Sequence, residues 1–503
     1  MNNEQTQHPP FNEFLEQLKQ RMKQVFHVRA NIDQMAIKRG MPPFVMREIM
    51  NLKPLATGIP AEYGGRGCKM DESIALLAAA SYESLALSLT FGINSALFLQ
   101  PVAKYAGEEA KQKVFRDFLE KQNMGGLMIT EPDFGSDALN MQTRFVKKDD
   151  NFHLKGTKHW AGLTGWAEYW LLTAREESPS GDLKRDIDFF ICNVNQPGQQ
   201  IEVEEVYENL GLYQIPYGRN KIDVSIPEKY RLQPHSTGVK MMLDLLHRSR
   251  MQFPGMAMGF IHRLLDESLD HARDRKIGGR PLIGYDQVQY RLSRLQSYYT
   301  ITSAMCLNSA EVAGIENDLS GGGLEANSVK SVVTDLMQDA AQSATQLVGA
   351  QAYKLDHIAG RGITDSRPFQ IFEGSNDILY AQIAEAIVKT MKKARNTRLF
   401  DTLKAEVLTK RSADRLKKFL DFDLSLPLLQ RKLVQLGAIV GRIVSADLVL
   451  KLGDKGYRSD LIEQAIQVLD EDIISMLTGF NQSGQPLVVD DYRPQSDWRS
   501  FLP

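Results

Sequence analysis

The chain has 503 residues, which at roughly 150 residues per domain predicts about three domains and excludes a small disulfide-stapled protein. Hydrophobic residues make up 43% and charged residues 24%, the composition of an ordinary globular protein rather than of a disordered chain, a collagen or a bundle of membrane helices. The 60 basic and 62 acidic residues leave a net charge of −2, so no overall field favours nucleic acid or an acidic surface.

The cysteine pattern excludes two further classes of protein. Cys68, Cys192 and Cys306 lie far apart and are odd in number, so they provide neither a disulfide framework nor a zinc site built on paired cysteines. We expect buried thiols in a reducing compartment. The first ten residues contain no basic segment followed by an apolar one, so we expect no secretion signal and a cytoplasmic protein.

The chain begins with a helical region. Apolar residues recur every three to four positions in segments such as 11–28 and 110–119, and turn-forming residues at 59–67 interrupt this pattern. Residues 84–103 form a run of 20 uncharged positions, long enough to span a membrane. Serine, threonine, asparagine and glutamine interrupt the run, which predicts a helix that is buried in protein and can line a pocket.

A strand-rich region and further helices follow. After Met128 the hydrophobic period changes toward alternation, which predicts a small antiparallel domain. Its predicted strands are residues 152–160, 169–174, 187–194 and 222–226. From Val239 the helical period returns, with a flexible loop at 320–323. The last segment contains one apolar helical stripe, formed by Leu461, Ile462, Ala465, Ile466, Leu469, Ile473 and Leu477.

These patterns divide the chain into four parts, residues 1–126, 127–235, 236–394 and 395–503. Their order is helical, strand-rich, helical and helical, so we predict a mainly α-helical chain with a central β-domain. Because helices and strands are segregated rather than alternating, a doubly wound nucleotide-binding sheet is not expected.

Several common catalytic signatures are absent from the sequence. It contains no GxGxxG or GxxxxGK[ST] motif, no GxSxG nucleophile elbow, and no HExxH or paired-cysteine site, so we predict no metal. Three segments instead combine turns, hydroxyls and backbone N–H groups that suit an anionic cofactor. They are residues 130–137 (TEPDFGSD), 155–160 (KGTKHW) and 371–377 (IFEGSND).

Seven short motifs, taken together and in this order, resemble the acyl-CoA dehydrogenase family over about residues 20–393. They lie at residues 60–67, 130–137, 158–160, Arg250, 275–279, 346–350 and 373–375. The resemblance implies an N-terminal helical domain, a middle β-domain and a four-helix bundle, with FAD bound between the β-domain and the bundle. It also implies a homodimer or homotetramer, because flavin sites in this family include residues of a neighbouring subunit.

The resemblance implies α,β-dehydrogenation of an acyl-CoA thioester, with electrons passed to an electron-transfer flavoprotein. Glu373 matches the family's catalytic base, and the apolar neighbours Ile371 and Phe372 are expected to desolvate its carboxylate and raise its pKa. The family's other base position is Ser249 here, which leaves Glu373 without a rival. The next residue, Arg250, is expected to support the base or to be an ordinary helix ion-pair partner.

The resemblance also implies contacts to the flavin. Thr130 and Ser136 match positions that contact the isoalloxazine edge and the pyrophosphate. Trp160 matches an aromatic residue packed on the flavin, and could equally belong to the domain core. Three residues are expected to reach the partner subunit's FAD: Arg275, Gln287 and Gln346. Two more are expected to face the adenosine part: Ser375 and Asp377.

Several positions depart from the family pattern and indicate a divergent member. Where the family has a threonine whose hydroxyl bonds flavin N5, this chain has Gly162. Either Thr164 substitutes through a shifted loop, or the flavin's redox tuning and oxygen reactivity differ. Gly278, Ala350 and Thr364 also replace the residues usual in the family.

Residues 395–503 extend beyond the family's core, in the manner of very-long-chain acyl-CoA dehydrogenases. A basic run in this extension predicts either peripheral membrane contact or a solvated helix face. The run consists of Lys410, Arg411, Arg415, Lys417 and Lys418. The apolar stripes of the extension are expected to pack on the bundle or on a second subunit.

Two alternative functions stay open. A related enzyme would act on carrier-protein thioesters, or would be an acyl-CoA oxidase reoxidised by O₂. A protein of another class would be an AidB-like flavin-containing protein that binds DNA or a partner. The net charge of −2 and the presence of Glu373 argue against the second alternative, so we expect no nucleic-acid partner.

Overall fold

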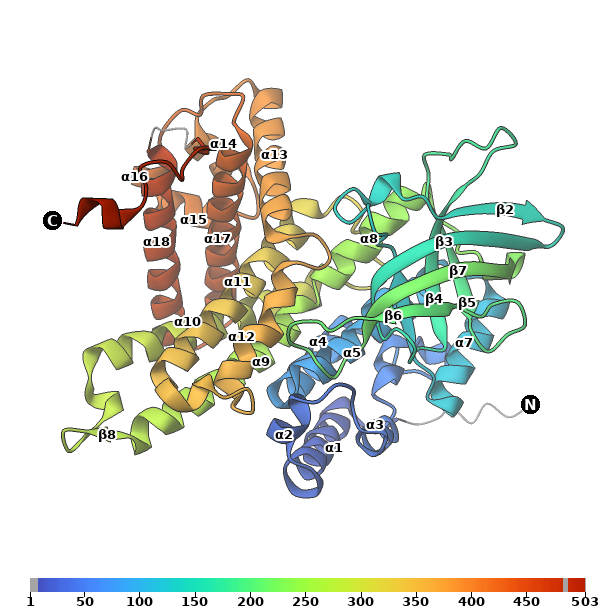
Figure 1. The fold of residues 1–503 in the computed structure, drawn as a ribbon. Coiled ribbons are helices and arrows are strands. Elements are labelled where there is room, and N and C mark those ends of the chain that lie inside the picture. Colours follow the sequence, from blue (N-terminus) through green and yellow to red (C-terminus); the bar gives the residue numbers. More distant parts are fainter. Residues whose placement is uncertain (1–7, 483–486, 503) are drawn as a thin grey trace.

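The structure is a computed structural model that describes residues 8–482 and 487–502 (Figure 1). It confirms the predicted fold class: a helical N-terminal region in blue, a curled sheet in teal and green, and a group of long helices from yellow to red. The first seven residues, on which the expectation of no secretion signal largely rests, lie outside the described residues.

The N-terminal region consists of short helices around one long apolar stretch. Its helices are α1 (Phe11–Lys23), α2 (Ile32–Ala36), α3 (Pro43–Met50), α4 (Met70–Glu83), α5 (Leu85–Asn94), α6 (Gln100–Tyr105) and α7 (Glu108–Lys121). A π-helical turn joins α5 to α6, so Leu85–Tyr105 runs as one helix. In the described residues this helix and Gln430–Asp454 are long and apolar enough to cross a membrane, but 94% and 72% of their most apolar segments lie buried inside the protein.

Several polar residues of Leu85–Tyr105 find partners inside the protein, as most buried polar groups do. The Ser88 hydroxyl donates to the Leu77 carbonyl (2.7 Å), and Asn94 Oδ1 accepts from the Gly125 amide at the start of the sheet (2.7 Å). The predicted buried helix is therefore confirmed. Its Asn94 contact joins the helical region to the β-domain.

The β-domain is a single sheet with the strand order β1-β4-β2-β3-β7-β6, and β5 also pairs with β4. The strands are β1 (Gly125–Met128), β2 (Arg144–Lys148), β3 (Asn151–Gly162), β4 (Tyr169–Glu176), β5 (Asp188–Asn193), β6 (Glu202–Val206) and β7 (Tyr217–Pro227). The prediction of a purely antiparallel domain is wrong for two pairs, β1–β4 and β2–β4, which are parallel. Parallel neighbours need a long connection, and β3 intervenes in sequence in both cases.

A bundle follows the sheet. Its helices are α8 (Gly238–Arg250), α9 (Phe253–Asp274), α10 (Asp286–Val312), α11 (Gly323–Val348), α12 (Ile358–Ser366) and α13 (Asn376–Ala394). The long helices α9, α10, α11 and α13 pack together, and α9 also packs against α4 of the N-terminal region. The turn just before α13 contains Glu373, so the bundle positions the predicted base.

The C-terminal extension adds α14 (Leu399–Ala405), α15 (Lys410–Arg415), α16 (Lys417–Leu420), α17 (Gln430–Asp454) and α18 (Ser459–Asn481). Helix α17 packs against α11 and α13, and α18 packs against α10 and α17 (Figure 1). Six of the seven residues in the predicted apolar stripe of α18 are buried, and Leu461 is partly exposed. Of the two expected packing surfaces for the extension, the bundle and a second subunit, the structure shows the first.

Two residues of the basic run, Arg411 and Arg415, form ion pairs with acids of α17 and α18. Arg411 binds Asp454 of α17 (2.7 Å), while the apolar neighbours Leu416 and Leu420 are buried and Phe419 is 38% exposed. A helix that lies in a membrane surface presents its apolar side outward. The structure therefore favours the solvated helix face over membrane contact.

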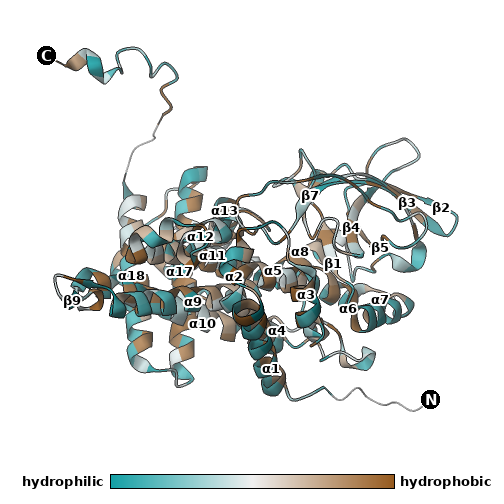
Figure 2. Ribbon diagram, turned by 60° about the horizontal axis from the view of Figure 1, so that its bottom comes forward, coloured by the Kyte–Doolittle hydropathy of each residue, from teal (hydrophilic) through white to brown (hydrophobic). Residues whose placement is uncertain are grey.

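A glycine lets the extension approach the bundle closely. An added Cβ on Gly437 of α17 would lie 1.8 Å from the Tyr380 carbonyl oxygen of α13. No side chain fits at that distance, so the two helix backbones are in direct contact at this point. Figure 2 shows residues 487–502 lying away from the body of the protein, so α17 and α18 make the main contacts of the extension.

Replacing Gly437 by alanine is expected to push α17 away from α13 and to lower the free energy of unfolding by about 1–3 kcal/mol, the usual cost of overpacking. Thermal unfolding measures the change. The matched control is Gly479→Ala on α18, where an added Cβ meets no atom within 4 Å. This control is expected to stabilise the helix by about 0.4–1 kcal/mol. An unchanged or higher melting temperature for Gly437→Ala would contradict the close contact.

Candidate active site

A cavity of about 430 Å³ lies where the helical region, the β-domain and the bundle meet. Its walls come from α5, the loop after β1, the end of β3, α8 and the turn before α13. Half of the ten residues predicted for the site line it: Thr130, Ser136, Trp160, Arg250 and Glu373. The structure thus brings the predicted base and three predicted flavin contacts into one space.

Glu373 lies in a strained turn. Its φ of 55° is in the left-handed region, which costs a non-glycine residue about 1–2 kcal/mol. Its Oε1 accepts a hydrogen bond from the Ser249 hydroxyl (2.8 Å), whereas Oε2 is buried and has no hydrogen-bond partner. Burial raises the pKa of Glu373 above its ordinary value of 4.5, although Ser249, Arg250 and Lys330 oppose the shift.

Arg250 holds the backbone of this turn rather than the carboxylate. Its Nε and Nη2 donate to the Glu373 carbonyl (3.0 and 2.7 Å), and its Nη1 donates to Asn327 Oδ1 on α11 (2.7 Å). Lys330, also buried on α11, donates to the Gly374 carbonyl (2.8 Å). The alternative of an ordinary helix ion-pair partner is wrong, since these bonds go to neutral oxygens. Arg250 thus connects the turn to α8 and α11.

Of the two apolar neighbours of Glu373, Phe372 packs against other side chains and Ile371 does not form part of the apolar surroundings. The Phe372 ring packs against Phe253 and Phe369, with ring centroids 6.0 and 4.9 Å away. Ile371 is 56% exposed, so the expectation that it desolvates the carboxylate is wrong. The amides of residues 371 and 372 both donate to the Pro368 carbonyl, and this tight turn directs the two side chains differently.

Trp160 forms one wall of the cavity. The pairing of β3 with β7 shifts register between His159 and Ala161, and Trp160 at the shift has a φ of 57°. Such a bulge turns a side chain out of its regular place in the sheet. Trp160 is 52% exposed and its ring centroid lies 4.5 Å from that of Tyr207, whereas Trp170 is 2% exposed. The alternative that places Trp160 in the domain core is therefore wrong.

A buried ion pair fixes the loop that carries Thr130 and Ser136. Lys158 Nζ lies 2.9 Å from Glu131 Oε1, and the side chains are 0% and 4% exposed. Two backbone amides in the segment before β2 also donate to this carboxylate (2.6 and 2.9 Å). Burial lowers the pKa of Lys158 to about 8, although the Glu131 carboxylate opposes the shift. These two motif residues hold the loop at the edge of the cavity.

Gly162 lines the cavity, but Ile93 fills the place of a side chain there. A Cβ on Gly162 would lie 2.7 Å from Ile93 Cδ1. The Thr164 hydroxyl is buried; it donates to the Ala161 carbonyl (2.8 Å) and accepts from Asn220 Nδ2 (3.1 Å). Of the two alternatives, the one in which Thr164 replaces the family's threonine is wrong, because its hydroxyl is engaged inside the β-domain.

The other five predicted residues do not line this cavity. Arg275, Gln287 and Gln346 are exposed, and Arg275 directly precedes a hairpin of β8 (Lys276–Ile277) and β9 (Arg280–Pro281). Ser375 is partly buried just before α13, and Asp377 is exposed in the first turn of that helix. Their contacts to the adenosine part or to a partner subunit's FAD stay predictions.

Three supporting residues were missed by the sequence analysis. Asn376 is buried at the start of α13, where it accepts from Lys330 (3.0 Å) and donates to Asp335 (2.7 Å). Lys330 carried a usable signal, because it is a charged residue among the apolar positions of α11 that pack into the core. Asn376 and Asp335 carried none, since polar residues at a helix start or on a helix face are common.

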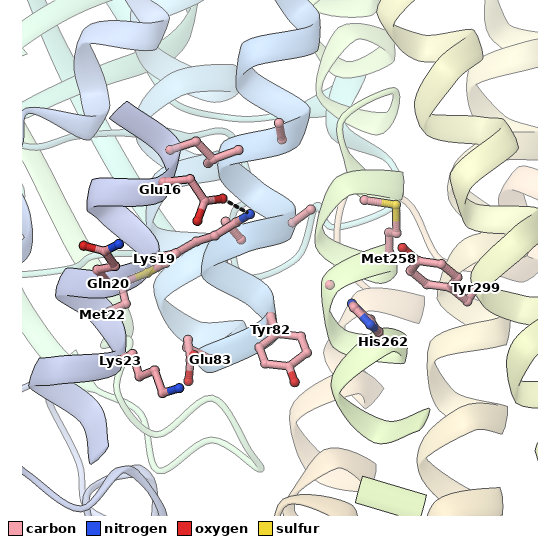
Figure 3. Close-up of a pocket in the computed structure, with 15 residues that line it drawn as sticks. Glu16, Lys19, Gln20, Met22, Lys23, Tyr82, Glu83, Met258, His262 and Tyr299 are labelled. Atoms are coloured by element: carbon pink, nitrogen blue, oxygen red, sulfur yellow. Dashed lines mark hydrogen bonds and ion pairs between the residues drawn. The ribbon is translucent and has the colours of Figure 1, made fainter. Parts of the chain in front are cut away.

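A second cavity, of about 560 Å³, lies between α1, α4, α9 and α10 (Figure 3). Figure 3 shows Tyr82, His262 and Tyr299 around it, with Lys19 and Glu16 bonded to each other on the α1 side. None of the ten predicted residues lines it. The two acids that line this cavity both have side-chain partners, Glu16 with Lys19 (2.7 Å) and Glu83 with His27 (2.6 Å). The first cavity, which contains the buried and unbonded Glu373 Oε2, is therefore the candidate site.

Comparisons with known proteins assign the chain to a family. Family models described as the N-terminal, middle and C-terminal domains of acyl-CoA dehydrogenase match residues 12–122, 126–224 and 236–388, together well over half of the chain. The chain belongs to the acyl-CoA dehydrogenase family. An acyl-CoA dehydrogenase of Bacillus subtilis is 26% identical over 325 residues, 64% of this chain and 83% of the relative. The human mitochondrial short-chain specific acyl-CoA dehydrogenase is 24% identical over 380 residues, 74% and 88% of the two chains.

Solved structures of family members share the fold. Butyryl-CoA dehydrogenase from Megasphaera elsdenii aligns with a TM-score of 0.67 at 19% identity, over 77% of this chain and 99% of that chain. An acyl-CoA dehydrogenase complexed with FAD from Bacillus anthracis aligns with a TM-score of 0.73 at 16% identity, over 93% and 87%. Because residues 395–503 are more than a fifth of the chain, the second alignment includes most of the extension. As a family member, the protein is a flavin-dependent oxidoreductase with FAD as its cofactor.

The candidate site fits FAD. The exposed ring of Trp160 offers a stacking surface, and the residues Thr130 and Ser136 bring hydroxyl groups to the cavity wall. A Cβ added to Gly135 would meet no atom within 4 Å, so the backbone of this loop is open to close approach by a cofactor.

Trp160→Ala is expected to weaken FAD binding about tenfold, because the stacking surface is lost. Titration of the apoprotein with FAD gives the Kd, and the ratio of flavin to protein absorbance gives the cofactor content. The matched control is Trp498→Ala near the C-terminus, where the ring is 69% exposed away from the cavity. Equal Kd values for Trp160→Ala and wild type would exclude Trp160 as a flavin wall.

Proposed function

We propose that this protein catalyses the α,β-dehydrogenation of an acyl-CoA thioester to a trans-2-enoyl thioester, with Glu373 as the base that removes the α proton. The observation that carries the proposal is the Glu373 carboxylate. It lines the cavity, its Oε2 is buried without a partner, and burial raises its pKa. The α proton of a thioester is a very weak acid, so its removal requires a well-placed base with increased proton affinity.

The neighbours of Glu373 prepare it for this role. Ser249 occupies Oε1 and leaves Oε2 to take the proton, while Arg250 and Lys330 bind the carbonyls of the turn. The backbone N–H of Glu373 donates to no atom of the residues described, so it is free to bind the thioester carbonyl. That hydrogen bond would stabilise the negative charge that develops on the carbonyl oxygen. Bound FAD supplies the acceptor for the β hydride.

The apolar part of the cavity suits an acyl chain. It is lined by Leu89, Ile93, Leu97, Leu243, Leu246 and Phe372. Each methylene group buried against such side chains contributes about 0.8 kcal/mol to binding. This composition supports a fatty acyl thioester rather than a polar substrate.

We further propose that electrons pass to an electron-transfer flavoprotein and that the protein acts as a homodimer or homotetramer. The exposed positions of Arg275, Gln287 and Gln346 support an assembly in which these residues reach a neighbouring subunit.

The three cysteines of the protein are free and buried, in agreement with a reducing compartment such as the cytoplasm.

One observation favours a second candidate, an oxidase reoxidised by O₂. Gly162 has no hydroxyl and that of Thr164 is engaged inside the β-domain, so neither places a hydroxyl beside the flavin. This difference would change the oxygen reactivity of the flavin. Rapid peroxide formation in air after addition of acyl-CoA would identify an oxidase. The same assay with acyl-carrier-protein thioesters tests the carrier-protein alternative.

Glu373→Gln is expected to slow the reduction of the bound flavin by acyl-CoA about 10²–10⁴-fold, because the base is removed. The measurement is the anaerobic bleaching of flavin absorbance by acyl-CoAs of graded chain length, which also identifies the preferred substrate. FAD content should be unchanged. Glu385→Gln, an exposed acid on α13, is the matched control and should bleach at the wild-type rate. Bleaching of Glu373→Gln at that rate would reject Glu373 as the base.

The pH dependence of kcat/KM has a predicted sign. The base must be ionised, and burial raises the pKa of Glu373, so activity should fall as pH decreases through a midpoint above 4.5. Ser249→Ala removes a hydrogen bond that lowers this pKa, so it should move the midpoint to higher pH. If the midpoint for Ser249→Ala does not move, or moves to lower pH, ionisation of Glu373 does not cause the loss of activity at low pH.

A further inference from the structure

One carboxylate on α11 holds both ends of the turn that contains Glu373. Asp335 Oδ1 accepts from the side-chain amides of Gln370 (2.8 Å) and Asn376 (2.7 Å), three residues before and three residues after Glu373. Its Oδ2 accepts from the Tyr380 hydroxyl on α13 (2.6 Å). Asp335 therefore fixes the position of the turn through three donors.

The counter-charge of Asp335 comes from the C-terminal extension. Arg442 on α17 places Nη2 3.3 Å from Asp335 Oδ2, and its Nη1 donates to the Tyr380 hydroxyl (3.3 Å). The Arg442 side chain is 8% exposed and that of Asp335 is 19% exposed. The direct backbone contact at Gly437 brings α17 close enough to α13 for this reach (Figure 1).

Stability alone does not account for this ion pair. Transfer of a guanidinium and a carboxylate out of water costs free energy, and a pair of hydrophobic residues in the same place is often equally stable or more stable. In addition, Arg442 Nε is buried without a hydrogen-bond partner. A role in placing other groups explains the charged pair better.

We propose that Arg442 is a positioning residue for the active site. By neutralising Asp335, it allows that carboxylate to hold Gln370 and Asn376 and so to maintain the strained φ of Glu373. Without Arg442, the largely buried Asp335 carboxylate lacks its ion-pair partner, and its bonds to the turn weaken. The C-terminal extension is then part of the catalytic apparatus. This inference rests on the proposed role of Glu373.

The test compares Arg442→Met with Arg442→Lys in the full-length, FAD-loaded protein, using an acyl-CoA that reduces the wild type. Arg442→Met is expected to lower kcat about tenfold or more, with KM changed less than about twofold, because a small displacement of a catalytic group slows the chemical step. Arg442→Lys, which keeps the charge, should recover most of the loss. A wild-type kcat for Arg442→Met would overturn the inference.

The matched control is Arg411→Met, which removes another arginine–aspartate pair of the extension, at the protein surface. It should leave kcat within about twofold of wild type, as expected for a solvent-exposed pair. A loss equal to that of Arg442→Met would show a general effect of the extension and would overturn the specific role of Arg442.

Asp335→Asn tests whether Arg442 acts through Asp335. In this background the side chain at position 335 has no charge to neutralise, so the part of the loss that passes through Asp335 disappears. Arg442→Met should then lower kcat by less than about twofold. Equal fold-losses in the wild-type and Asp335→Asn backgrounds would overturn the proposed route.

Hydrogen–deuterium exchange separates failure of this inference from failure of the proposed function. Peptides covering residues 370–376 should exchange faster in Arg442→Met than in wild type, while peptides of α7 should not change. If this occurs but Glu373→Gln is fully active, the proposed function fails and the link from Arg442 to the turn stands. If Glu373→Gln is inactive and Arg442→Met exchanges like wild type, the inference fails.

A second variant covers the case in which Arg442→Met does not fold. Tyr380→Phe removes one hydrogen-bond donor to Asp335 Oδ2. Faster exchange of residues 370–376 in this variant supports the link, and unchanged exchange overturns it.

Discussion

A buried carboxylate with one oxygen left unbonded is the constraint on which this site depends. In most buried places such an acid would bind a proton or move to find a donor. Here the surrounding groups prevent movement, because Arg250 and Lys330 bind the carbonyls of the turn and Ser249 binds the other carboxylate oxygen. The network therefore satisfies the polar groups around Glu373 and leaves Oε2 itself available.

The rest of the fold is arranged around this turn. Helix α11 supplies three of its supports, Asn327, Lys330 and Asp335, while α5 and the bulged end of β3 supply the apolar and aromatic walls of the cavity. The bundle thus contributes the polar supports of the turn, the N-terminal region contributes the apolar wall, and the β-domain contributes the aromatic wall. The extension adds a fourth contribution through Arg442, which makes residues 395–503 more than an appended packing surface.

The sequence predicted the order of helical and strand-rich regions, a buried helix at residues 84–103 and five residues that line the cavity, because hydrophobic period and short motifs are local properties. The predictions were wrong where the structure depends on how segments that are separate in the sequence are arranged in space. The parallel pairing of β4, the outward direction of Ile371 and the engagement of Thr164 depend on register and turn shape. Arg442 and Asp335 are 107 positions apart, so no local pattern could have joined them.

Exchange of the α protons of an acyl-CoA with D₂O tests the role of Glu373 most directly, because it reports proton removal alone, whichever acceptor takes the electrons. In anaerobic D₂O the wild-type protein is expected to place deuterium at the α carbon. Glu373→Gln, with FAD bound, is expected to give only the uncatalysed background. Equal deuterium incorporation by the two proteins would contradict Glu373 as the base.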